Sequence, residues 1–130
     1  MMNLESKKSV IHKSQKDFFD FLTNLNNFEQ LMPENTTKFE VDGESFIFSL
    51  KGMPEIRLVI KEKQEFDKIV FGAASSKLNF SLTTNIIEVS ENSCEAQLLF
   101  EGDFNPMMAM MIKSPLQKFI DTLSENSAKL

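Results

Sequence analysis

Hydrophobic residues recur along this chain with two different periods. From Thr36 to Glu101 they alternate with polar residues, a period of two that is typical of strands with one buried face. At residues 14–25 and 106–128 they recur every three or four positions, which predicts amphipathic helices. The pattern therefore predicts a sheet that is preceded by a short helical region and followed by a longer one.

Turn signals divide the alternating region into short strands. Asp42-Gly43 is typical of a tight hairpin, and further turns are expected at residues 52–54, 64–67 and 91–93. Short connections between consecutive strands favour antiparallel pairing. With a first strand near the N-terminus, the sheet is expected to have seven strands, at residues 4–12, 36–41, 46–50, 56–61, 68–74, 80–89 and 94–101.

Two short helices are predicted between the first and second strands. Ser14 is a suitable cap for a helix over residues 14–25, where Phe18 and Leu22 lie at helical spacing. A second helix is expected at residues 28–32, because the following Pro33 ends it.

A long helix is predicted at the C-terminal end of the chain. Asn105-Pro106 combines a capping residue with a proline suited to the first helical position, and the helix is expected to reach about Ala128 with a kink at Pro115. Only this helix is long enough to cover the apolar face of the sheet. The chain is therefore predicted to be one α+β domain over residues 1–130.

The composition predicts a large apolar interior and excludes several partners. The 130 residues are 42% hydrophobic, and all thirteen aromatic residues are Phe, so no aromatic ring carries a polar group. The net charge of −5 and the single arginine disfavour nucleic acid as a partner; the strand phase directs this arginine, Arg57, outward.

No apolar run approaches the roughly 18 residues of a membrane span, and no signal peptide is recognisable. A single cysteine fits a reducing compartment, so we expect a cytoplasmic protein without a membrane span.

The residues that catalysis or metal binding would need are few. Cys94 and His12 are the only cysteine and histidine, too few for a zinc site, and the motifs of nucleotide-binding proteins and zinc hydrolases are missing. Glu101 and Asp103 lie two residues apart but are expected to form a solvated strand end. The sequence therefore predicts no catalytic residue, no metal and no cofactor, although it leaves enzyme activity open.

The predicted order of one strand, two short helices, six strands and a long helix resembles the helix-grip fold of the START-like (SRPBCC) superfamily. The run over residues 28–33 resembles the short second helix of the superfamily branch related to carbon monoxide dehydrogenase, and residues 99–112 resemble the last strand and helix start of small bacterial START-like proteins. The resemblance implies a seven-stranded curved antiparallel sheet wrapped around the C-terminal helix. It also implies a cavity between them for lipids, sterols, polyketides or other hydrophobic molecules.

The side chains expected to line such a cavity come from the inner face of the sheet and from the start of the long helix. Met107, Met108, Met110 and Met111 crowd that start and cannot all face one way, so some of them are expected at a cavity mouth or in solvent. The predicted lining residues are Phe39, Phe48, Leu58, Phe71, Phe80, Leu82, Leu98, Phe100, Met108, Met111 and Ile112.

Three functions follow from these observations. The first is non-catalytic binding of a small hydrophobic ligand, lipid-like or aromatic, between the sheet and the long helix. The second is an enzyme of the polyketide cyclase or aromatase type, for which Thr84, His12 and Asn105 are the inner-face polar candidates. The third is a protein-interaction module with a filled core, which docks a protein partner on its Met-rich helix start.

Overall fold

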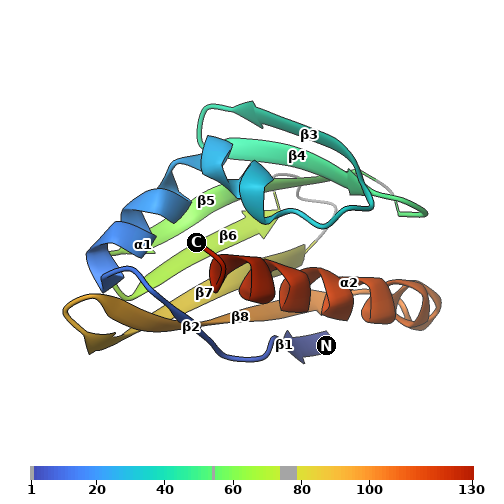
Figure 1. The fold of residues 1–130 in the computed structure, drawn as a ribbon. Helices are drawn as coiled ribbons and strands as arrows, with labels where there is room; N and C mark the ends of the chain where they lie inside the picture. Colours follow the sequence, from blue (N-terminus) through green and yellow to red (C-terminus); the bar gives the residue numbers. More distant parts are fainter. Residues whose placement is uncertain (1, 54, 74–78) are drawn as a thin grey trace.

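One antiparallel sheet curves around the long helix α2 (Pro106–Ser127) in the structure, a computed structural model that describes residues 2–53, 55–73 and 79–130 (Figure 1). The strands of these residues are β1 (Met2–Glu5), β2 (Ser9–Ile11), β3 (Thr36–Asp42), β4 (Ser45–Leu50), β5 (Ile56–Gln64), β6 (Lys68–Ala73), β7 (Asn79–Ser90) and β8 (Ser93–Asp103). Their order across the sheet is β1-β8-β7-β6-β5-β4-β3, and β2 also pairs with β8. The predicted helix-grip α+β fold is confirmed; Pro54 and Ala74, at the ends of two predicted elements, lie outside the described residues.

The predicted first strand forms as two pieces along one edge of β8. Leu4 pairs with Phe100 in β1, and Ile11 pairs with Cys94 in β2. Between the pieces, the Ser6 hydroxyl accepts a hydrogen bond from the backbone N–H of Leu98 at 2.9 Å. The sheet therefore occupies seven positions across, as predicted, with an interruption at residues 6–8.

The two short helices are separately capped. Ser14 caps α1 (Gln15–Thr23) by accepting the N–H of Asp17 at 3.1 Å. The second helix is a 3₁₀ helix, η1 (Leu25–Leu31), which begins three residues before the predicted start because the Asn24 side chain caps it. In the described part of the chain, no helix combines the length and apolar character that a membrane span requires.

Helix α2 begins and extends as the sequence predicts. The Asn105 side chain accepts the N–H of Met108 at 2.8 Å, which satisfies one of the free donors at the helix start. The helix continues through Pro115 to Ser127 as one element.

The core lies between the concave face of the sheet, η1 and α2. Phenylalanine rings fill much of it: Phe28 stacks on Phe46 with centroids 5.2 Å apart, and Phe48 stacks on Phe119 of α2 at 4.8 Å with nearly parallel planes. Since Phe48 belongs to β4, this stack joins α2 to the far half of the sheet. Burial of these rings is the main apolar contribution to the stability of the domain.

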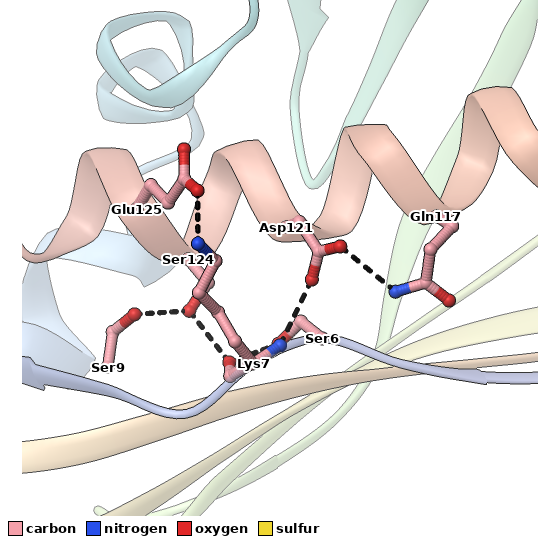
Figure 2. Close-up of polar contacts among 7 residues, drawn as sticks. All are labelled: Ser6, Lys7, Ser9, Gln117, Asp121, Ser124 and Glu125. Carbon is pink, nitrogen blue, oxygen red and sulfur yellow. Dashed lines mark hydrogen bonds and ion pairs between the residues drawn. The ribbon is translucent and has the colours of Figure 1, made fainter.

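Polar side chains attach α2 to the interruption between β1 and β2 (Figure 2). The Ser124 hydroxyl donates to the carbonyl of Lys7 at 2.9 Å, and the Lys7 N–H donates to Asp121 Oδ1 at 3.0 Å. Because Ser124 has only one hydroxyl hydrogen, Ser9 donates the hydrogen bond of 2.6 Å that joins the two serine oxygens. Lys7 also pairs with Glu125. Outside the view of this figure, the Gln117 side chain donates to the carbonyl of Glu5 at 2.8 Å. We call this set the β1–β2 clamp; its members are Glu5, Ser6, Lys7, Ser9, Gln117, Asp121, Ser124 and Glu125.

Removal of the central hydroxyl of the β1–β2 clamp should destabilise the protein. Ser124→Ala leaves the buried Ser9 hydroxyl without a partner and removes one of the two hydrogen bonds that the Lys7 carbonyl accepts, so we expect the free energy of unfolding to fall by about 1–3 kcal/mol. Urea denaturation measures the change. Ser114→Ala on the exposed side of the same helix is the control and should change stability by less than about 0.5 kcal/mol. Equal effects of the two substitutions would contradict a structural role for the clamp.

Truncation of the β4 ring that meets α2 should be more costly. Phe48→Ala removes the stack on Phe119 and opens a cavity in the core, so the free energy of unfolding should fall by about 3–5 kcal/mol. The comparison is Ile87→Ala at a side chain that is 57% exposed, for which we expect a change of about 0.5 kcal/mol or less. A loss below about 1 kcal/mol for Phe48→Ala would show that the ring is not part of a packed interior.

Candidate functional site

Most of the predicted lining residues pack against other side chains in the interior. Phe80 and Phe100, for example, stack with centroids 5.7 Å apart. Leu98 also borders a void of about 10 Å³, which is small compared with any organic ligand. Buried or half-buried in this way are Phe39, Phe48, Leu58, Phe71, Phe80, Leu82, Leu98, Phe100 and Ile112. Contact of these residues with a ligand stays a prediction.

The methionines at the start of α2 lie at the surface. Met107, Met110 and Met111 are 75%, 83% and 71% exposed, and Met108 is 37% exposed. Met108 and Met111 were predicted to line the cavity. In the structure, neither side chain is buried against the sheet. The cluster is therefore an exposed apolar patch and contributes little to the core.

A groove of about 870 Å³ opens beside α2, between this helix and the end of η1, and Glu125 of the β1–β2 clamp lies at its border. It lies between the helix, the segment that leads from η1 into β3, and the end of β4. Buried Leu50 and Phe119 contribute to its wall, together with half-buried Met32, Pro33, Pro115 and Leu130. Polar residues complete the lining: Gln30, Glu34, Asn35, Lys51, Ser114, Lys118, Thr122, Glu125, Asn126 and Lys129.

Charges of both signs lie around the groove. Lys51, Lys118 and Lys129 are exposed cations, and no acidic side chain of the described residues lies within ion-pair distance of them. Glu125, which also lines the groove, pairs with Lys7 in the β1–β2 clamp. The groove is therefore lined mostly by polar and charged residues, with a smaller apolar part in its wall.

A polar side chain lies in the interior on the other side of η1. Thr84 of β7 is only 1% exposed, and its Oγ1 makes no hydrogen bond with any described residue. It borders the void of about 10 Å³ together with Ser127, whose hydroxyl donates to the Leu123 carbonyl at 2.7 Å. The other two inner-face candidates differ: His12 is exposed, and Asn105 caps α2.

The residues considered for catalysis or metal binding do not form a reactive centre. Cys94 is completely buried, and this burial raises the pKa of its thiol to about 11, whereas His12 is exposed. Glu101 and Asp103 are exposed at the end of β8, where Asp103 accepts a hydrogen bond from Asn79. Within residues 2–53, 55–73 and 79–130, no group of three or more His, Cys, Asp or Glu side chains is arranged to hold a metal ion.

The groove is the feature that the sequence pattern did not indicate. Its lining comes from three separate segments, residues 30–35, 50–51 and 114–130, and most of these residues are polar. No periodic pattern marks a surface of this kind. The prolines at positions 33 and 115, at the end of η1 and inside α2, are the only local signals near it.

Comparison with known proteins identifies the fold but no close relative. No protein family model matches the sequence, and no curated protein matches it. Several solved structures match over nearly the whole chain. A conserved protein from Geobacillus kaustophilus has a TM-score of 0.71 at 7% identity, and the alignment covers 98% of this chain and 93% of that chain.

Two further matches carry descriptive names. A norcoclaurine synthase variant from Thalictrum flavum, solved with a transition-state analogue, has a TM-score of 0.70 at 11% identity, with 98% of this chain and 94% of that chain covered. A START superfamily protein from Mycobacterium smegmatis has a TM-score of 0.66 at 10% identity, with 98% and 97% covered. Together with the sheet that curves around α2, these matches show that the chain has the START-like helix-grip fold.

Proposed function

We propose that the protein binds a small, uncharged hydrophobic ligand non-covalently in the groove beside α2. The groove carries this proposal, because its volume of about 870 Å³ lies in the range of small-molecule sites and its wall includes the buried apolar side chains of Leu50 and Phe119. The fold supports it as well. A structure with the same fold, norcoclaurine synthase, was solved with dopamine and hydroxybenzaldehyde, so this architecture accommodates small organic molecules.

The chemistry of the groove favours an apolar body over a charged one. Its affinity would come from burial of apolar surface, at about 25 cal/mol per Å², mainly against the half-buried Met32, Pro33, Pro115 and Leu130, because Leu50 and Phe119 are only 2% and 3% exposed. The flanking lysines lie on the exposed rim, where water screens them, so they contribute little to the binding of an uncharged molecule. An aromatic bicycle or a lipid-like chain fits this description.

A protein-interaction module is the second candidate function. Two observations favour it, the closely packed interior and the exposed patch of Met107, Met108, Met110 and Met111, because methionine-rich surfaces adapt to varied apolar partners.

A cyclase or aromatase activity has less support. Such an enzyme needs several polar groups that converge on the ligand. Thr84 is the single inward-facing polar candidate with an unpaired side chain in the described interior.

A bulky residue in the groove should block ligand binding. We expect wild type to bind N-phenyl-1-naphthylamine, an uncharged fluorescent probe, saturably, and Thr122→Trp to weaken binding at least tenfold because the indole occupies the groove. Thr83→Trp is the matched control, since Thr83 lies on the outer face of β7 away from the groove, and it should bind as wild type does. Fluorescence titration measures both. If wild type binds no probe, the interaction module becomes the better-supported function.

The buried thiol gives a second test, directed at enzyme activity. Because burial raises the pKa of Cys94 from its usual 9.0 to about 11, the folded protein should hold a neutral, unreactive thiol at pH 8, and Ellman's reagent should label it at least a hundredfold more slowly than in urea. The same shift makes the contribution of the thiol to stability complete below pH 9 and lost as the pH rises toward 11. Rapid labelling of the folded protein would instead show that the Cys94 thiol is accessible and reactive, as a cysteine nucleophile must be.

A further inference from the structure

We propose that the Thr84 hydroxyl is the hydrogen-bonding anchor for a hydroxyl or carbonyl group at one end of the bound hydrophobic ligand. This inference rests on the proposed function and names the class of ligand. It follows from an interior polar group without a protein partner, from the position of the groove next to it, and from the kind of helix that separates the two.

Thr84 has no evident structural reason to be polar. Its Oγ1 is buried and forms no hydrogen bond with the described residues, a situation that costs free energy compared with a valine of the same shape. Neighbouring inward positions of β7 hold Leu82 and Ile86, which are both apolar and buried. A hydroxyl at this position is therefore explained by a partner that arrives from outside the protein chain.

The groove and the void at Thr84 lie on opposite sides of one contact between η1 and α2. Gln30 and Met32 of the η1 region face the groove, and Leu31 between them faces the void. On α2, Asn126 lines the groove and its neighbour Ser127 lines the void. The end of η1 thus separates a ligand-sized groove from the unpaired hydroxyl.

The backbone hydrogen bonds of this separating element have a less favourable geometry than those of an α-helix, although its apolar side chains are buried. η1 is a 3₁₀ helix of seven residues, longer than the three or four residues usual for this poorer hydrogen-bond geometry. Its last residue, Leu31, is tied to α2 by a hydrogen bond of 2.8 Å from the Asn126 side chain to the Leu31 carbonyl. Displacement of this last turn would join the groove to the void and bring one end of a ligand to Thr84.

The surroundings of Thr84 restrict what it can receive. Phe18, Leu22, Phe28 and Leu98 border the same void, so a charged group would be buried there without compensation. An uncharged oxygen satisfies the threonine hydroxyl at no such cost. The ligand class is therefore an apolar molecule that carries a single hydroxyl or carbonyl at its buried end.

The test compares two probes that differ by one hydroxyl, naphthalene and 2-naphthol, by fluorescence titration at pH 7. Wild type should bind 2-naphthol about fivefold more tightly than naphthalene, the size of effect expected of one buried hydrogen bond. Thr84→Val should remove this preference by weakening 2-naphthol alone, and Thr84→Ser, which retains a hydroxyl, should preserve it. Thr83→Val on the outer face of the sheet is the matched control and should behave as wild type.

Each outcome decides the proposal. The urea midpoint of Thr84→Val should equal or exceed that of wild type, and Thr84→Ala provides a second hydroxyl-free variant if the valine variant folds poorly. If the hydroxyl-free variants still bind 2-naphthol more tightly than naphthalene, the Thr84 hydroxyl does not anchor the ligand. Its hydrogen-bond partner would then be a buried water. Equal binding of both probes by wild type would also overturn the anchor while leaving the proposed function intact. Binding of neither probe would overturn both.

Discussion

The position of α2 depends on the β1–β2 clamp. At the interruption at residues 6–8, the N–H and carbonyl of Lys7 point toward the helix, where no neighbouring strand can pair with them. Side chains of α2 satisfy both groups, so the helix is held by directional bonds on this side (Figure 2). These bonds add directional constraints to the close apolar packing of the helix against the sheet.

The opposite side of α2 is attached differently. There the helix meets β4 through the Phe48–Phe119 stack and meets η1 through the bond from Asn126 to Leu31. Directional bonds are fewer on this side, and the groove occupies the remaining space between α2, η1 and the end of β4. The two sides of the helix therefore differ: one side is held by directional bonds, and the other borders the groove.

The sequence predicts the elements well where local chemistry determines them. Asp42-Gly43 forms the expected hairpin between β3 and β4, where Gly43 has a positive φ of 62°, and Asn105 caps α2. The interruption of the first strand was not predictable, because it depends on Ser124, more than a hundred residues away in the sequence. Met108 and Met111 were assigned to a cavity from the fold resemblance and from their place at the start of the helix, and neither shows which face of the first turns extends beyond the sheet. The groove depends on three distant segments and has no local signature.

The β1–β2 clamp also constrains how the chain reaches its folded state. Its hydrogen bonds join residues 114, 115 and 117 positions apart, whereas the hairpins from β3 to β8 connect neighbouring segments. Closing a loop of that length has a large entropic cost, which only a formed sheet can offset by presenting β8 as a template for both β1 and β2. During synthesis, the N-terminal strands therefore cannot bond to α2 until residues 121–124 have been made. Until β1 and β2 pair with β8, its edge is open to wrong pairing.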